Sequence, residues 1–190
     1  MKRDFLGDSY DAVKRLWRDL LQHWAPLHAD PRFIPGDLRE DFTLLTGIPM
    51  LTDNRPDVFS ILNDPDTGIR LPGKRNQSES RSHISISFII RQLAESGASC
   101  VITFDQSDYR HSRMERKEQR QAKMWSLADS GFHSFYYVSH APFLFAASNS
   151  QALREVRQIL IAAGMPTKCL EPRMRDIKRT FDSGRTKLSS

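Results

Sequence analysis

The sequence predicts an α/β protein with three layers: a mainly parallel sheet flanked by helices, with an antiparallel hairpin near its C-terminal edge. Apolar runs of strand length alternate with amphipathic helical segments, which is typical of parallel βαβ units. The last two apolar runs are separated by only a short turn, which favours a hairpin. The chain has 190 residues, of which 39 % are hydrophobic. This is enough to bury a substantial core and excludes disorder over the whole length.

The first third of the chain is predicted to contain a strand, a helix and a long irregular segment. Residues 4–6 are a short apolar run that Gly7 ends, and Asp8 or Ser9 can cap the helix that follows. Apolar side chains recur at spacings of three and four over residues 10–24, which predicts an amphipathic helix. Five prolines and two glycines in residues 25–57 favour mostly loop, with a short regular piece near Phe42.

The middle of the chain is predicted to form a strand, a crossover helix and a second strand. Residues 58–62 read as a strand, and residues 71–81 as a polar surface loop. Residues 82–95 are a helix candidate, although the alternation at residues 84–87 is also compatible with a strand. We favour the helix because residues 100–104 form another apolar strand, and parallel neighbours need a crossover between them.

The last part of the chain is predicted to form a charged helix, the hairpin and a final helix. The charged helix covers about residues 113–130, and the hairpin strands cover residues 132–140 and 142–147. Asn149 or Ser150 can cap the last helix, at residues 151–163.

Charge is divided unevenly along the chain. The net charge is +5, but residues 1–70 carry 9 basic and 12 acidic side chains, and residues 71–190 carry 19 and 11. The net charges are therefore −3 and +8. We expect one α/β domain over residues 1–171 and a basic flexible tail over residues 172–190, because the tail has almost no apolar material. A basic second half is typical of polyanion binding, and charge that only solvates a surface is the alternative.

Several functional classes lack their sequence signals. No run approaches the ~20 apolar residues of a membrane span, and charges occupy the place of a signal-peptide core, so a cytoplasmic location and no membrane partner are expected. Cys100 and Cys169 are far apart, and the histidines form no zinc-type pair, which argues against a disulfide framework or structural zinc. P-loop, dinucleotide-binding and Gly-x-Ser-x-Gly strings are also missing from the sequence.

Acidic residues follow all three predicted parallel strands. In an open α/β sheet, sites form outside the carboxyl ends of the strands. If these strands are neighbours, their carboxylates converge, and Mg²⁺ or Mn²⁺ is the neutralising ion expected for such an oxygen-rich cluster. The alternative is that these acids only end strands and cap helices. The candidate metal ligands are Asp8, Asp64, Asp66 and Asp105.

Two histidines stand beside predicted element boundaries, each after a serine. His83 and His140 are candidate general bases, since an unperturbed imidazole titrates near neutral pH. Either could instead hydrogen-bond only its own loop. With Asp105, they complete the predicted catalytic set.

Basic residues gather in the loop before the crossover helix, on the charged helix and in the tail. Those on the helix fall at spacings of three and four, so they share a face that can neutralise phosphates without reading sequence. An exposed helix paired internally through Glu115 and Glu118 is the alternative. The candidate nucleic-acid-binding residues are Lys74, Arg75, Arg113, Arg116, Lys117, Arg120 and Lys123.

From Phe59 onward, the order of elements resembles the second half of a class I S-adenosylmethionine-dependent methyltransferase. In that family a strand ends in an Asp-Pro-Pro-Tyr type motif and is followed by a helix, a strand, a helix and an antiparallel hairpin. The matching string here is Asn63-Asp64-Pro65-Asp66. The resemblance covers about two thirds of the chain and implies a methyltransferase-like domain, active or degenerate.

Three hypotheses follow from the sequence. The first is a nucleic-acid-associated protein that acts as a divalent-metal-dependent phosphodiesterase or nuclease, using the strand-end aspartates. The second is the methyltransferase-like domain. The third is a non-catalytic adaptor that binds a protein or ribonucleoprotein partner through its basic helix and tail.

Overall fold

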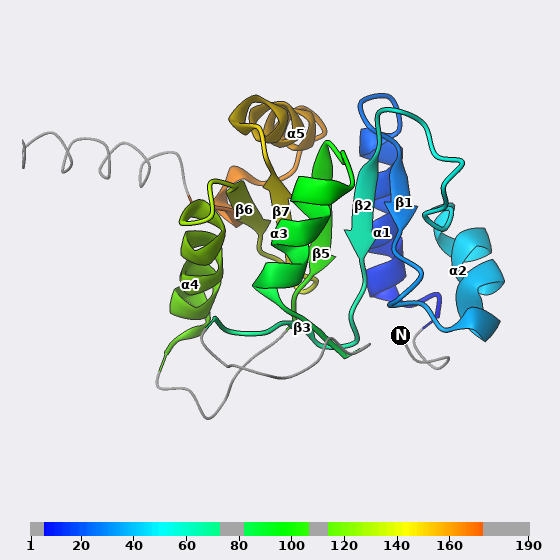
Figure 1. The fold of residues 1–190 in the computed structure, drawn as a ribbon, viewed down its shortest axis with the longest axis horizontal. Helices are drawn as coiled ribbons and strands as arrows, with labels where there is room; N and C mark the ends of the chain where they lie inside the picture. Colours follow the sequence, from blue (N-terminus) through cyan, green and yellow to red (C-terminus); the bar gives the residue numbers. More distant parts are fainter. Residues whose placement is uncertain (1–5, 73–81, 107–113, 173–190) are drawn as a thin grey trace, which may run out of the picture.

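A six-stranded mixed sheet organises the protein, and its core strands are mostly parallel (Figure 1). The computed structural model describes residues 6–72, 82–106 and 114–172. Strands β1, β2 and β5 are parallel, whereas β7 is antiparallel to β5 and β6 is antiparallel to β7. In their spatial order the strands are β1 (Leu27–Ala29), β2 (Ser60–Asn63), β5 (Cys100–Phe104), β7 (Phe143–Ala147), β6 (His133–Tyr137) and β8 (Leu170–Glu171).

Helices cover both faces of this sheet, which gives the three layers that the sequence predicts. On β5, Ile102 packs with the helices of one face and Val101 with those of the other, as the alternation of side chains along a strand requires. The first face is covered by α1 (Ser9–Leu21), α2 (Arg39–Thr46) and α5 (Ser150–Ala162). The second face is covered by α3 (Ile86–Glu95) and α4 (Arg116–Ala128).

Helix boundaries follow the capping signals in the sequence. Asp8 accepts hydrogen bonds from the first backbone N–H groups of α1, and Asn149 does the same for α5. Ser85 caps α3, and Glu115 and Glu118 form a capping box at the start of α4. These caps fix the helix starts that border the sheet.

Only residue 6 of the strand predicted at residues 4–6 is described, and it belongs to no strand of the sheet. Residues 4 and 5 lie outside the described residues, and Leu6 lies in a turn. The edge strand is β1, inside the segment predicted to be mostly loop. Because β1 is only three residues long and lies between two prolines, its sequence shows no periodic pattern of apolar residues. Its outer edge contacts residues 49–51 through backbone hydrogen bonds with Ala29.

The remaining elements agree with the prediction apart from their ends and three short strands. Residues 83 and 84, placed in the predicted crossover helix, form β4 (His83–Ile84), which pairs with β3 (Gly68–Ile69). The strand reading of the alternation there was therefore partly right, and α3 begins at Ile86. The hairpin of β6 and β7 is confirmed. Two short 3-10 helices, η2 (Gly36–Leu38) and η3 (Thr167–Cys169), and β8 complete the described structure.

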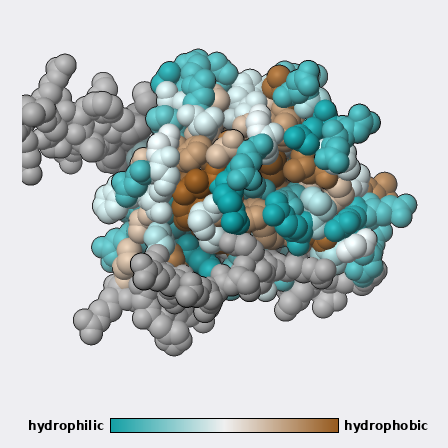
Figure 2. All heavy atoms as spheres, viewed as in Figure 1, coloured by the Kyte–Doolittle hydropathy of each residue, from teal (hydrophilic) through white to brown (hydrophobic). Residues whose placement is uncertain are grey.

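No helix in the described ranges combines the length and apolar character that crossing a membrane requires. The polar and apolar side chains of one face are mixed on the surface, with hydrophilic groups spread across it (Figure 2).

Candidate functional site

A pocket opens at the carboxyl ends of β2 and β5, beside the start of α1. It encloses a cavity of about 290 Å³. Asp8, Tyr10 and Lys14 line it from the α1 side, and residues 64–67 line it from the segment after β2. Phe104 and Gln106 contribute from the end of β5, and Ser82 from the segment before β4. This is the position at which open α/β sheets bind ligands.

Lys14 forms a buried ionic cluster at the floor of the pocket. Its ammonium Nζ donates to Asp11 at 2.8 Å and to Asp64 at 2.7 Å. The Phe42 ring lies under the same ammonium, 5.7 Å from Nζ to the ring centroid. Because all three charged side chains are nearly fully buried, each depends on the others for compensation.

The charges in this cluster shift the titration of its members. Burial alone would lower the pKa of Lys14, but attraction to Asp64 and Asp11 and the hydrogen bonds to both outweigh burial and raise this pKa above 10.5. Burial raises the pKa of Asp64, and the attraction of Lys14 offsets this only in part. Lys14 is therefore a firmly held cation and not an amine nucleophile.

Aromatic side chains form a second wall of the pocket. The rings of Tyr10 and Phe104 lie 5.4 Å apart, tilted by 57°. His140 stacks on Tyr10, with ring centroids 5.8 Å apart. The Tyr10 hydroxyl accepts a hydrogen bond of 2.6 Å from Nε2 of Gln106. These contacts hold the Tyr10 ring in one orientation beside the carboxylates.

Asp105 lies apart from the pocket floor, in a second buried cluster. Its carboxylate accepts from Lys123 Nζ at 2.7 Å, from the Tyr136 hydroxyl at 2.7 Å and from the backbone N–H of Ile69 at 2.8 Å. The α-carbon of Gly68 packs against the same carboxylate, because a Cβ there would lie 2.5 Å from Oδ1. Asp105 thus ties the segment after β2 to α4 and β6.

Burial governs the titration of the groups around Asp105. It lowers the pKa of Lys123, although attraction to Asp105 opposes this. It also raises the pKa of Tyr136 well above 10.0, and the adjacent negative charge of Asp105 acts in the same direction. Tyr136 is therefore a neutral hydrogen-bond donor over the physiological pH range.

Three of the four predicted metal ligands line the pocket, and the fourth is not among its lining residues. Asp8, Asp64 and Asp66 line the pocket, whereas Asp105 belongs to the cluster around Lys123. Ammonium groups already neutralise Asp64 and Asp105. Among the residues described, we find no group of three or more His, Cys, Asp or Glu side chains able to hold a metal ion. Asp8 is a helix cap and not a strand end, and a role for these aspartates in binding Mg²⁺ or Mn²⁺ stays a prediction.

The two candidate histidines lie in different surroundings. His140 is exposed and contacts the pocket through Tyr10. His83 lies on β4, and its pKa is lowered by partial burial and by the positive charge of Arg70. A catalytic role for either histidine stays a prediction.

The basic face predicted on the charged helix is partly internal. Lys123 is fully buried against Asp105, and both Nε and Nη2 of Arg120 donate to Glu171. Each of these two residues therefore forms an internal ion pair, and this corrects their assignment to phosphate binding. Arg116 and Lys117 are exposed. Lys74, Arg75 and Arg113 lie outside the described residues.

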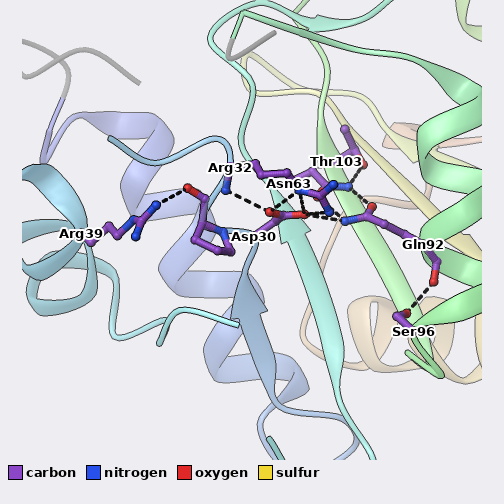
Figure 3. Close-up of polar contacts among 8 residues, drawn as sticks. Asp30, Arg32, Arg39, Asn63, Gln92, Ser96 and Thr103 are labelled. Carbon is purple, nitrogen blue, oxygen red and sulfur yellow. Dashed lines mark hydrogen bonds and ion pairs between the residues drawn. The ribbon is translucent and has the colours of Figure 1, made fainter. Parts of the chain in front are cut away.

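A further polar network lies at the carboxyl ends of the strands, on the α3 side (Figure 3). Gln92 of α3 donates to Asp30 at 2.8 Å and exchanges hydrogen bonds with Asn63. Asn63 also donates to Thr103 at 3.2 Å. The network therefore joins α3 to the ends of β1, β2 and β5 around one buried carboxylate.

Sequence reasoning missed most of these partners, but two left a signal. Lys14 shares the helical stripe of Tyr10, Trp17 and Leu21, and Lys123 shares that of Gln119 and Leu127. A lysine on a buried stripe indicates a buried ionic partner. Asp30 and Arg32 left no comparable signal.

No protein-family model, curated protein or solved structure matches this chain.

Proposed function

We propose that this protein is a nucleic-acid-associated domain that takes an amino-bearing nucleobase into the pocket at the carboxyl ends of β2 and β5. One observation carries the proposal: two aromatic rings, those of Tyr10 and Phe104, line a pocket that Asp8, Asp64 and Asp66 also line. Aromatic faces stack on any base. An ionised carboxylate accepts hydrogen bonds but cannot donate one, so it pairs only with a donor group on the ligand.

The carboxylates select among the bases. Adenine and cytosine carry exocyclic amino groups, and an acidic side chain accepts a hydrogen bond from such a group. Thymine and uracil present carbonyl oxygens at the equivalent position, which would face Asp64 or Asp66 unfavourably. We therefore expect the pocket to prefer adenine or cytosine over thymine or uracil.

The size and charge of the pocket limit the part of the ligand that enters. A cavity of about 290 Å³ lies just below the range for small-molecule sites, roughly 300 to 1,000 Å³. The carboxylates of Asp8, Asp11, Asp64 and Asp66 lie around the pocket floor, and Lys14 is the only cation among the described residues that line the pocket. A phosphate would be repelled there, so the base enters and the phosphates stay outside.

Methyl transfer is the second candidate. The order β2, α3, β5, α4 and the antiparallel pair β6 and β7 agrees with the order that the resemblance implies. The residues after β1 do not fit a glycine-rich cofactor loop, however. Residues 30–35 contain no glycine, and Asp30 is closed off by Gln92 and Arg32. We therefore favour a degenerate, base-binding relative and assign no step to S-adenosylmethionine.

Isothermal calorimetry with nucleosides tests the proposal. The wild-type protein should bind adenosine or cytidine and should bind uridine at least tenfold more weakly, because a mispaired acceptor costs about 1 to 3 kcal/mol. Removing the amino donors, as in N6,N6-dimethyladenosine, should weaken binding to a similar extent. S-adenosylmethionine serves in the same assay as the probe for the second candidate.

The Asp66→Asn variant sharpens this experiment, because an amide can both donate and accept. The variant should narrow the difference in binding affinity between adenosine and uridine. Asp129→Asn is the matched control, since Asp129 is an exposed acid at the end of α4. Equal affinity for all nucleosides, or no binding of any, would overturn the base-pocket proposal. Heat from S-adenosylmethionine alone would favour methyl transfer.

A further inference from the structure

Arg32 is held rigidly at the surface by a buried carboxylate. Its Nε and Nη2 donate to Asp30 at 2.8 to 3.2 Å, in a two-pronged arrangement (Figure 3). The Asp30 side chain is 1 % exposed, whereas the Arg32 side chain is 62 % exposed. Nη1 has no hydrogen-bond acceptor within the described residues. One edge of the guanidinium is therefore fixed and another edge faces outward.

The surroundings of Arg32 fix its orientation further. Its guanidinium carbon lies 4.2 Å from the centroid of the Phe88 ring. The loop that carries it is braced by Arg39, which donates to the carbonyl oxygens of Pro31 and Ile34. Arg32 also neutralises a carboxylate that is itself buried. The hydrogen bond from Gln92 holds Asp30 in position, and this orients the guanidinium as well.

Arg91 places a second guanidinium over the same ring. Its carbon lies 5.7 Å from the Phe88 centroid. Arg91 is exposed, and no carboxylate of the described residues forms an ion pair with it. Both guanidinium groups therefore lie within 6 Å of the centroid of one ring, and guanidinium matches phosphate geometry.

These arginines lie at the same edge of the sheet as the pocket. Arg32 comes three residues after the end of β1, and Phe88 is in the first turn of α3. Neither Arg32 nor Arg91 lines the pocket. The acidic pocket excludes phosphates, and an arginine pair outside it supplies the missing positive charge.

We infer that Arg32 and Arg91 form a phosphate subsite over Phe88 that holds the backbone of a single-stranded nucleic acid. This inference rests on the proposed function, because it supplies the backbone contact for a strand whose base enters the pocket. The two sites make separable contributions: the pocket sets which base binds, and the arginine pair sets the dependence of binding on salt.

Fluorescence anisotropy with labelled oligo(dA) and oligo(dT), titrated over a series of salt concentrations, tests the inference. Each of Arg32→Gln and Arg91→Gln should weaken binding of both oligonucleotides equally. Each should also reduce the slope of log K against log salt by about 0.7, the value for one lost phosphate contact on a single strand. Arg32→Lys keeps the charge but not the two-pronged bond to Asp30, so it should restore the slope only in part.

Arg154→Gln is the matched control, because Arg154 is an exposed arginine on α5, across the sheet from α3. It should leave the slope unchanged. An unchanged slope in both arginine variants would overturn the subsite. Equal binding of oligo(dA) and oligo(dT), with a slope that still falls in the variants, would overturn the base pocket but support the subsite. Inorganic tripolyphosphate, which has no base, should bind the wild type more tightly than either variant, and equal binding would overturn the subsite independently.

Discussion

The ammonium of Lys14 donates a hydrogen bond of 2.7 Å to the carboxylate of Asp64, 50 residues further along the chain. This bond joins the first turns of α1 to the segment that follows β2, and the pocket lies between those two pieces of chain. The Lys14 to Asp64 pair therefore both closes the pocket floor and determines its charge.

Replacing Lys14 with methionine should destabilise the protein by about 3 to 5 kcal/mol, because Asp64 and Asp11 would stay buried without their cation. Urea unfolding followed by circular dichroism measures this loss. Arg18→Gln provides the comparison, since Arg18 pairs with Asp19 at a more exposed site and should cost less than about 1 kcal/mol. Equal effects of the two substitutions would show that burial of the Lys14 cluster does not govern its energetics.

Tyr136→Phe should change the dependence of stability on alkaline pH. The folded pKa of Tyr136 is raised well above 10.0, so above pH 10.0 the unfolded chain loses this proton before the folded protein does. The stability that Tyr136 contributes is therefore present below pH 10.0 and is lost as pH rises toward the folded pKa. The unfolding free energy of the wild type should fall more steeply than that of Tyr136→Phe, by up to about 1.4 kcal/mol per pH unit. If the unfolding free energies of the wild type and of Tyr136→Phe fell with the same slope above pH 10.0, this prediction would be contradicted.

Gly68→Ala should disturb both stability and the pocket wall. A Cβ at Gly68 would lie 2.5 Å from Oδ1 and 2.8 Å from the α-carbon of Asp105, at a φ of +132°. We expect a loss of at least about 2 kcal/mol in thermal or urea unfolding. Gly36→Ala is the control, because nothing lies within 4 Å of its added Cβ. A Gly68→Ala protein as stable as the wild type would show that the segment after β2 moves freely.

Tyr10 substitutions separate stacking from hydrogen bonding in the pocket. Tyr10→Phe keeps the ring and loses only the hydrogen bond from Gln106, so adenosine affinity should change by less than about threefold. Tyr10→Ala removes the stacking surface and should weaken adenosine binding by about 1 to 3 kcal/mol. Calorimetry of both variants checks this order. If Tyr10→Ala bound adenosine as well as Tyr10→Phe did, stacking would have no part in binding.

The sequence predicted the fold well where periodic segments are long. The apolar run at Cys100–Phe104 coincides with β5, and the stripes of α1 and α5 place those helices within a few residues. The exception is β1, whose three residues carry too short a pattern to separate from loop. Its place at the sheet edge depends on tertiary pairing with β2, which no local pattern encodes.

The candidate site was predicted only in part. Placing Asp64 and Asp66 after a parallel strand was correct, because strand ends determine which side chains reach that edge. The counter-charges were not predicted, since Lys14 and Lys123 reach their aspartates from helices whose packing is set by the whole core. Pairing of these aspartates with lysines from distant helices is a long-range property of the fold.

Intermolecular nuclear Overhauser effects between adenosine and the protein test the base-pocket proposal most directly. With adenosine bound, the base protons should show contacts to the aromatic protons of both Tyr10 and Phe104, and these contacts should disappear on addition of a tighter-binding oligo(dA). Binding of adenosine without contacts to either ring, or failure of adenosine to bind, would contradict the account.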